Sequence, residues 1–494
     1  MRRPLLTVLA VLFLLSFRAG AQSSRWYLIE MFGAKAGYMH ATEDSKDGRI
    51  INATHVVIDM KRGVAPISVA MSSEFIETKD GKPISMKSVQ KMGATAVTQE
   101  CTFNPDGSIE SVGSQGDQVN KTSLPKPEGE WMTPAAAERH SVAQFKAGAK
   151  EIIVRAIDPM SGVTPITATR KIGASQKITS MGREIDAIKT TVTVSNQPGI
   201  TSTEYLNSEG ELIRSETQLG GIGVTMTAAT EEEAKKEGDG PAPEVFASTF
   251  IKPDRKIANA RTLTRGVYII STTDGNELAE MPDTGTQKYE RLAPDKARLT
   301  ITVEAIYPAA PEDVANRAFL ASTAMCSITD EKVKELALRA LTKLEEGETG
   351  ELDKAKACRD FVYGFIKKKS LGVGFASATE TARSREGDCS EHGVLLCALL
   401  RANGIRARVA TGLIYADSFA GSQNIFGYHM WAQALITADG KSRWVDLDAT
   451  LPMGITYDAT HICMGTSDLA DGDQTQSMMS VATSMGRVKI QVGE

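Results

Sequence analysis

Cysteine is scarce in this sequence, and the cysteines that are present follow no regular spacing. Six occur among 494 residues, whereas small disulfide-rich exported domains carry them densely and at framework spacing. We therefore expect no disulfide framework, and we interpret the cysteines other than Cys389 as small core residues. The six positions are Cys101, Cys326, Cys358, Cys389, Cys397 and Cys463.

Positive charge is not in excess either, and the usual metal and phosphate motifs are missing. The formal net charge is −5 at pH 7, which does not favour nucleic acid or an anionic surface as a partner. No group of His, Cys and Asp residues has zinc spacing, and no calcium loop or phosphate-cradling glycine motif occurs. The sequence thus predicts no metal and no cofactor.

Long apolar runs are absent beyond the start of the chain, so we expect no membrane span. Met1-Arg2-Arg3 is positively charged, a mostly apolar stretch runs from Leu5 to Phe17, and Ala19-Gly20-Ala21 follows. This order is typical of a signal peptide. We expect residues 1–21 to be removed by cleavage after Ala21, which would leave a periplasmic or secreted protein.

Residues 22–230 show the alternating, β-branched pattern of antiparallel sheets. X-Gly pairs separate apolar or threonine-rich runs, and such a pair between two runs is a hairpin signal. The pairs are Asp47-Gly48, Asp80-Gly81, Asp106-Gly107 and Glu209-Gly210. We predict a large all-β N-terminal region made of one or two β-units.

Composition divides the rest of the chain into further segments. A charged stretch rich in Gly and Pro is typical of a linker, and apolar positions at helical spacing indicate helices over 331–344 and 354–367. The expected segments are a linker at 231–245, a β-rich connecting region at 246–310, an α+β core at 311–465 and a C-terminal tail at 466–494 with a short strand near Val488.

Cys389 stands at the start of an expected buried helix. Asp388 is a suitable N-cap, and Glu391 falls where it completes a capping box. An almost wholly apolar stretch from Val394 to Leu400 comes next, and Gly404 is placed to end the helix. Unpaired N–H groups at a helix start favour thiolate over thiol. We interpret Cys389 as a free nucleophile whose own N–H is an expected oxyanion donor.

A histidine and two aspartates follow on strand-like segments, 428–437 and 442–447, which a hairpin at Asp439-Gly440 joins. Side chains alternate along a strand, so each segment presents one polar and aromatic face. The hairpin brings these faces together, which places an aspartate beside the imidazole. The two faces consist of His429, Trp431 and Gln433, and of Trp444, Asp446 and Asp448. A thiol, an imidazole and a carboxylate can act as nucleophile, base and orienting acid.

Three motifs in this order resemble the transglutaminase-like superfamily, whose core is similar to papain. They are Gly387-Asp388-Cys389 at a helix start, His429-Met430-Trp431 on a strand, and Trp444 through Asp448 to Thr450 on the next. The resemblance covers about 310–464 and implies a catalytic triad of Cys389, His429 and Asp448. The acid of the family matches Asp448, two residues before Thr450, and Asp446 is the alternative.

Other residues near these motifs have simpler interpretations. Asp458-Ala459-Thr460-His461-Ile462 resembles a segment that follows this core in exported bacterial members, and we interpret His461 as structural. We also expect His392 to be structural and Cys397 to be a packing residue. Trp431 and Trp444 are expected to be walls of the site.

The resemblance implies an acyl-transfer enzyme that forms a thioester on Cys389 and acts on a protein or peptide substrate. Water as acceptor would make it a peptidase or amidase, which we slightly favour, and a lysine amine would make it a glutamine–lysine crosslinker. The motifs do not decide between the two, because groove shape and water exclusion select the acceptor. The alternative from another class is a catalytically silent scaffold whose N-terminal β region binds envelope material.

Overall fold

The computed structural model divides the chain into two compact units, Met1–Val245 and Phe246–Glu494. The predicted signal peptide, residues 1–21, lies outside the residues that the structure describes. The described residues are 22–62, 65–92, 95–115, 118–197, 200–219, 222–238, 242–244, 249–305, 307–344, 347, 350–370, 376–469 and 485–493.

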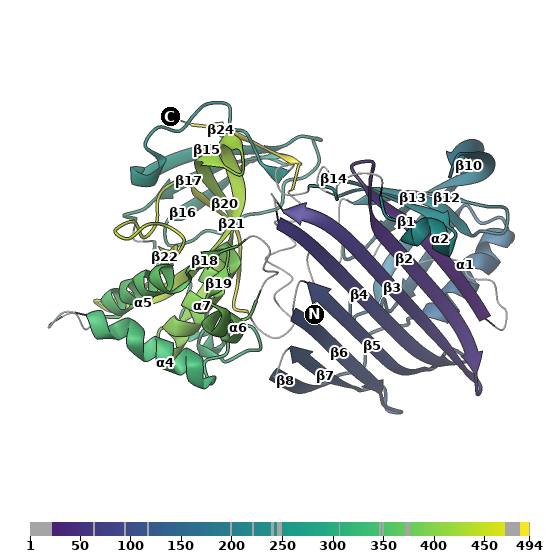
Figure 1. Ribbon diagram of the computed structural model, residues 1–494, viewed down its shortest axis with the longest axis horizontal. Helices are drawn as coiled ribbons and strands as arrows, with labels where there is room; N and C mark the ends of the chain where they lie inside the picture. The colour runs from purple at the N-terminus through teal and green to yellow at the C-terminus, as the bar shows by residue number, and fades with distance from the viewer. Residues whose placement is uncertain are drawn as a thin grey trace. The chain divides into compact units, whose positions relative to one another are not determined.

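The unit Met1–Val245 is built on an antiparallel sheet of 14 strands. The strand order is β8-β7-β6-β5-β4-β3-β2-β1-β14-β13-β12-β11-β10-β9, and the strands β2 to β8 run side by side in Figure 1. The first strand lies inside the sheet, with Trp26 opposite His40 on β2 and opposite Ala229 on β14. The prediction of a large N-terminal β region is confirmed.

The strands of this sheet have the following bounds: β1 Gln22–Met31, β2 Ala34–Lys46, β3 Arg49–Arg62, β4 Ala65–Thr78, β5 Pro83–Met92, β6 Thr95–Phe103, β7 Ile109–Gln115, β8 Gln118–Leu124, β9 Glu151–Ala156, β10 Ile166–Ser180, β11 Arg183–Val194, β12 Thr201–Leu206, β13 Leu212–Leu219 and β14 Ile222–Ala229.

Turn chemistry and side-chain alternation explain the register of this sheet. Between β2 and β3, Asp47 and Gly48 both have positive φ, at 52° and 76°, as a two-residue type I′ turn requires. Residues such as Ile29, Met39 and Val56 are fully buried. A slip by one residue would expose that whole apolar set, so burial fixes the pairing.

Among the described residues of this unit, two helices accompany the sheet. α1 (Pro134–Lys146) begins beside the buried carboxylate of Glu77, which accepts hydrogen bonds from Ala135 N at 3.0 Å and Thr133 Oγ1 at 2.8 Å. The first part of the segment predicted as a linker, 231–245, instead forms the helix α2 (Glu231–Lys235). A capping box at its start and packing against β1 hold this short helix, so local helix signals override the linker-like composition.

The unit Phe246–Glu494 contains two four-stranded antiparallel sheets, ordered β22-β21-β20-β23 and β16-β17-β15-β24, and a short parallel pair, β18-β19. The predicted strand near Val488 is present as β24. The bounds are β15 Arg265–Thr272, β16 Gln287–Ala293, β17 Lys296–Thr302, β18 Lys368–Lys369, β19 Glu386–Gly387, β20 Ala407–Phe419, β21 Ser422–Ala438, β22 Lys441–Leu447, β23 His461–Ser467 and β24 Val488–Val492.

The helices of this unit are short except for α5 and α7, and both helices predicted from apolar periodicity are present as α4 and α5. The bounds are α3 Pro311–Ala315, α4 Glu331–Ala340, α5 Glu351–Phe365, α6 Ala378–Ser384 and α7 Cys389–Ala402, with 3-10 turns η3 Ala260–Thr262, η4 Arg317–Leu320 and η5 Leu341–Lys343.

Helix α7 is central to the helical layer. It packs on β21 and β20 and contacts α4, α5 and α6 (Figure 1). Every residue from Val394 to Leu400 is fully buried, and burying one large apolar side chain contributes roughly 1.5–3 kcal/mol. On β21, Met430 and Ala432 belong to the helical core, whereas Trp431 belongs to the core shared with the sheet β16-β17-β15-β24. The sheet β22-β21-β20-β23 therefore has helices on one face and the sheet β16-β17-β15-β24 on the other.

Within the described ranges, no helix combines the length and apolarity needed to cross a bilayer.

Candidate active site

Cys389 is the first residue of α7, and the groups around it fix the helix start. Asp388 caps the helix, with Oδ1 accepting from Ser390 N at 2.9 Å and from Ser390 Oγ at 2.8 Å. Glu391 completes the capping box by accepting from Asp388 N at 2.8 Å, and its other oxygen accepts from Ala376 N at 2.7 Å. The backbone that carries the thiol is therefore held from both sides.

Cys389 differs from the other cysteines in accessibility. It is half-buried, whereas the other five are buried. A reagent in solution can therefore reach Cys389 before it reaches any other thiol of the folded chain.

His429, on β21, bonds to Asp448, which directly follows the end of β22. The distance from His429 Nε2 to Asp448 Oδ2 is 2.8 Å, and the two side chains are 8% and 0% exposed. The other carboxylate oxygen, Oδ1, accepts from Thr450 N at 2.7 Å and from Thr450 Oγ1 at 2.8 Å. Because Nε2 is engaged by Asp448, Nδ1 is the ring nitrogen left for Cys389.

Asp446, the alternative acid, accepts hydrogen bonds from a different set of donors. Its Oδ1 accepts from Trp431 Nε1 at 2.8 Å and from Gln433 Nε2 at 2.6 Å, and its Oδ2 accepts from Thr286 Oγ1 at 2.8 Å. These bonds join the two facing sets of side chains predicted from strand alternation. The aspartate that the structure brings to His429 is therefore Asp448.

The charges of the two partners stabilise each other. Burial disfavours a charged imidazole, but the charge and hydrogen bond of Asp448 outweigh it and, with a hydrogen bond to Cys389, raise the pKa of His429 to about 9. Burial also disfavours a charged Asp448, yet His429 and His461 hold the pKa of this carboxyl well below its usual range. At neutral pH the pair is an imidazolium and a carboxylate.

The loop that carries Asp448 is held by an arginine that is fully buried. Arg359, on α5, donates from Nε to the carbonyl of Asp448 at 2.8 Å and from Nη2 to the carbonyls of Pro452 and Ile455 at 3.0 and 2.6 Å. Hydrogen bonds from a charged donor contribute roughly 1.5–3 kcal/mol each. This contact places the acid relative to the helical layer.

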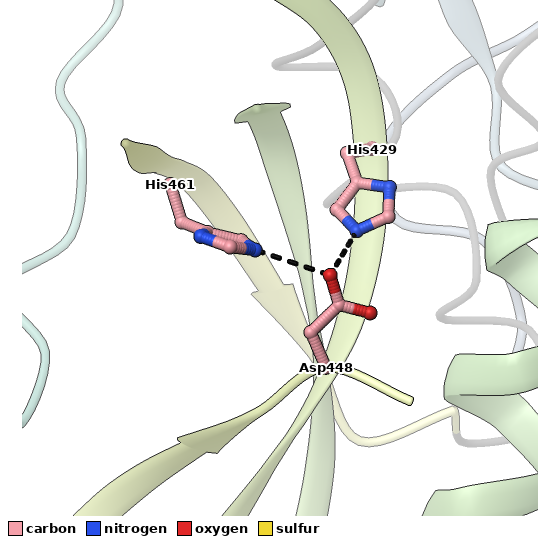
Figure 2. Close-up of side chains that lie close together, drawn as sticks. All are labelled: His429, Asp448 and His461. Carbon is pink, nitrogen blue, oxygen red and sulfur yellow. Dashed lines mark hydrogen bonds and ion pairs between the residues drawn. The ribbon is translucent and has the colours of Figure 1, made fainter. Parts of the chain in front are cut away.

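A second histidine, His461 on β23, also bonds to Asp448. Figure 2 shows its Nε2 and that of His429 directed at the same oxygen, Oδ2, with His461 at 3.2 Å. On its other side His461 contacts Asp458, which in turn pairs with Arg261. Asp-Ala-Thr occurs at both 448–450 and 458–460. The repeat could have signalled a second turn of the same kind, but not its contact with Asp448.

In the part of the chain that the structure describes, His429, Asp448 and His461 also have ligand atoms within 4.8 Å of one another, a spacing compatible with a metal ion. The side chains of Asp448 and His461 are 0% exposed, and both Nε2 atoms already donate to Oδ2. We therefore interpret the group as hydrogen-bonded side chains.

The remaining predicted residues have structural surroundings. His392 is buried and bonds through Nδ1 to the carbonyl of Asp388 at 2.5 Å, and Cys397 is fully buried in α7. Trp431 is fully buried and stacks on His429 with ring centroids 6.1 Å apart. Trp444 was expected to be a wall of the site, but this is wrong: it packs edge-on against Phe319 and donates to Asp313 at 2.7 Å.

Comparisons with known proteins agree with this geometry at the level of the family. Residues 339–449 match the model of the transglutaminase-like superfamily. Cys389, His429 and Asp448 all lie within that range. The unit Phe246–Glu494 thus contains a transglutaminase-like domain, which confirms the resemblance seen in the three motifs.

No curated protein matches the chain. Among solved structures, a β-barrel-like protein of unknown function from Brucella abortus is 13% identical, with a TM-score of 0.32, and covers 42% of this chain and 95% of its own. A proposed cysteine protease from Cytophaga hutchinsonii is 18% identical, with a TM-score of 0.27, and covers 46% and 81%. A proposed protease from Parabacteroides distasonis is 11% identical, with a TM-score of 0.19, and covers 76% and 69%.

Proposed function

We propose that this protein is an exported cysteine-dependent acyl-transfer enzyme that acts on amide bonds of proteins or peptides. The observation that carries the proposal is the half-buried Cys389 at a capped helix start, hydrogen-bonded to an imidazole whose other nitrogen lies 2.8 Å from a buried carboxylate. Nucleophile, proton carrier and orienting acid are the groups that acyl transfer through a thioester needs.

The reaction begins with Cys389 as thiolate and His429 as imidazolium. The sulfur attacks the amide carbonyl carbon, and the N–H of Cys389, which has no partner within the helix because it is the first helical residue, donates to the oxyanion. The intermediate collapses, the C–N bond breaks, and the leaving amine takes the proton from His429. A thioester on Cys389 and a neutral imidazole remain.

The second half of the reaction returns the enzyme to its starting state. The acceptor loses a proton to His429 and attacks the thioester carbon, and the sulfur leaves as thiolate. Water as acceptor gives a carboxylic acid, and a lysine amine gives an isopeptide bond. We favour hydrolysis, since water is abundant in the compartment to which a signal peptide at residues 1–21 would direct the protein.

Selective alkylation tests whether Cys389 is a nucleophile. At mildly acidic pH, iodoacetamide should modify Cys389 at least tenfold faster than an ordinary thiol, and His429→Ala should remove this advantage. Because the other five thiols are buried, Cys389→Ala is a matched control that should leave the folded protein unlabelled. Sluggish labelling in the parent protein would favour the silent scaffold instead.

The acceptor can be identified separately. Incubation with a glutamine-containing protein and a labelled primary amine detects crosslinking, and release of new N-termini from the same protein detects hydrolysis. We expect new N-termini that require Cys389. Amine incorporation that requires Cys389 would contradict a pure hydrolase.

Export is tested by the N-terminus of the mature protein. Protein recovered from the cell envelope or the medium should begin at Gln22, and a chain that retains Met1 in the cytoplasm would contradict the proposed localisation.

A further inference from the structure

A second aspartate–histidine pair lies directly behind Asp448. His461 directs Nε2 at Asp448 Oδ2, 3.2 Å away, and Nδ1 at the carbonyl oxygen of Asp458, 3.0 Å away, with Asp458 Oδ1 at 3.3 Å. A backbone carbonyl and an ionised carboxylate only accept hydrogen bonds. Both ring nitrogens of His461 must then carry hydrogen, so His461 is an imidazolium.

The two aspartates are held in the same way. Asp448 Oδ1 accepts from the backbone N and hydroxyl of Thr450 at 2.7 and 2.8 Å, and Asp458 Oδ1 accepts from those of Thr460 at 2.9 and 2.5 Å. In each Asp-Ala-Thr turn the threonine therefore engages Oδ1 of the aspartate, and Oδ2 faces a cation. For Asp448 the cations are the two histidines, and for Asp458 it is Arg261, whose Nη1 lies 2.8 Å away.

The surroundings of His461 keep water away from its charge. Its side chain is 0% exposed, and the rings of Tyr457 and Trp431 enclose it at centroid distances of 4.5 and 5.2 Å. The groups that face it or its partners are Asp448, Asp458, His429, Arg261, Tyr457, Tyr268 and Asp446. Of these, only the two aspartates touch it with negative charge.

The ionised groups form a chain in which the sign alternates. The order is Cys389, His429, Asp448, His461, Asp458 and Arg261, with three negative and three positive members when Cys389 is a thiolate. The centroids of the two histidine rings are 5.8 Å apart. A cation at that distance in a buried site acts strongly on its neighbour.

We propose that His461 is a positioning residue, a buried imidazolium that shares the Asp448 carboxylate with His429 and so weakens the hold of Asp448 on the His429 proton. The proposal rests on the proposed function, in which His429 gives that proton to the leaving amine. His461 lies beyond residues 339–449, the range matched by the family model. Burial disfavours its charge, but Asp458 and Asp448 outweigh burial and raise the pKa of His461 to about 9.

Alkylation of Cys389 by iodoacetate at varied pH measures the effect. The anionic reagent is attracted by the His429 imidazolium, so the rate falls when His429 loses its proton, near pH 9 in the parent protein. We call this fall in rate at high pH the alkaline limb. His461→Gln keeps an N–H donor and removes the charge, so the pH of the alkaline limb should rise by about one unit. An unmoved limb in a folded variant would overturn the proposal.

A matched control and a second measurement complete the test. His392 is also a buried histidine, but burial lowers its pKa, so it is neutral and His392→Gln should leave the limb in place. An equal shift in this control would overturn the proposal. In the parent protein, ¹⁵N NMR at pH 7 should show both His461 nitrogens protonated. A neutral tautomer would overturn the proposal even if His461→Gln does not fold.

These outcomes are distinct from failure of the proposed function. If Cys389 of the parent protein reacts no faster than an ordinary thiol and shows no alkaline limb, acyl transfer itself is contradicted. If Cys389 is fast and the limb is present but insensitive to His461→Gln, only the role of His461 is wrong.

Discussion

At the scale of single residues, substitutions of the two neighbouring aspartates, Asp446 and Asp448, should differ in their effect on turnover. Asp448 contacts His429 and has four hydrogen-bond donors around it. Asp448→Asn removes the charge that holds the imidazolium and should lower the Cys389-dependent rate by roughly 10²- to 10⁴-fold, the range that general acid–base groups contribute. Steady-state cleavage of the glutamine-containing test protein, with circular dichroism to verify folding, measures this loss.

Asp446→Asn is the matched control. Asp446 is buried and accepts from Trp431, Gln433 and Thr286, none of which is proposed to carry a proton in the reaction. An amide would face at least one of these donors with its own N–H, at a cost of about 1–3 kcal/mol in stability. Turnover per folded molecule should stay within a few-fold of the parent. A larger loss than in Asp448→Asn would reverse the assignment of the acid.

The buried imidazolium of His461 also predicts how stability depends on pH. Its pKa is raised from 6.5 to about 9 in the folded state, so its contribution is present in full below about pH 6.5 and is lost as pH rises to about 9. The loss is on the order of 3 kcal/mol. Urea unfolding at pH 6.5 and 9.5 should show a smaller decrease in unfolding free energy for His461→Gln than for the parent. Equal decreases would contradict a charged His461.

Asp448 and His461 differ in how well the sequence reveals them. Asp448 follows a hairpin strand that pairs directly with the strand of His429, so alternation and spacing predict the contact. His461 starts β23, which pairs with β20, and two strands separate it from β22. The order of strands across a sheet follows from packing of the whole layer rather than from local pattern, so this contact became visible only in the structure.

At the scale of elements, the helix α7, which carries Cys389, is the part best predicted. Its start, apolar middle and glycine end depend on interactions within a few residues, and the structure shows the capping box at Asp388 and the C-cap at Asn403 followed by Gly404 with φ of 78°. The helix α2 was missed because its five residues carry no apolar stripe, and only its capping box marks it.

Gly387 should be required for the position of the thiol. A Cβ on this residue would overlap Glu391 Cβ and lie 2.5 Å from its Cγ, which are the near atoms of a side chain fixed by two backbone N–H groups. Gly387→Ala should cost about 1–3 kcal/mol and slow alkylation of Cys389. Thermal unfolding and iodoacetamide labelling together measure both effects.

Gly404, at the other end of α7, provides the control for Gly387→Ala, because its substitution should lower stability without lowering the reactivity of Cys389. Nothing lies within 4 Å of a Cβ built there, so Gly404→Ala should cost about 1–2 kcal/mol for its left-handed backbone alone. Cys389 should keep its reactivity in this variant. If both glycine variants slow alkylation equally, the contact of Gly387 with Glu391 does not control the thiol.

At the scale of the whole molecule, the two units have separate cores. Large sets of buried side chains lie within Met1–Val245 and others within Phe246–Glu494, and separate cores favour separate unfolding transitions. Acyl transfer as proposed needs groups from the second unit only. Composition alone could not have shown that the 14 strands of the first unit join into one sheet.

Strand β24 should contribute to the stability of the unit Phe246–Glu494. β24 pairs with β15, and Ile490, 2% exposed, packs in the core that also contains Trp431 and Ile462. Ile490→Ala should therefore destabilise Phe246–Glu494 by about 2–5 kcal/mol. Hydrogen exchange resolved by peptide should show faster exchange in β15 and β17 and unchanged exchange in β1 to β14.

The exposed neighbour Lys489 provides the control for this prediction. It lies on the same strand but faces away from the core, so Lys489→Ala should change stability by no more than about 0.5 kcal/mol. Exchange that quickens equally in both units after Ile490→Ala would show that they unfold as one. Faster exchange confined to the second unit would show that β24 stabilises that unit independently of the first.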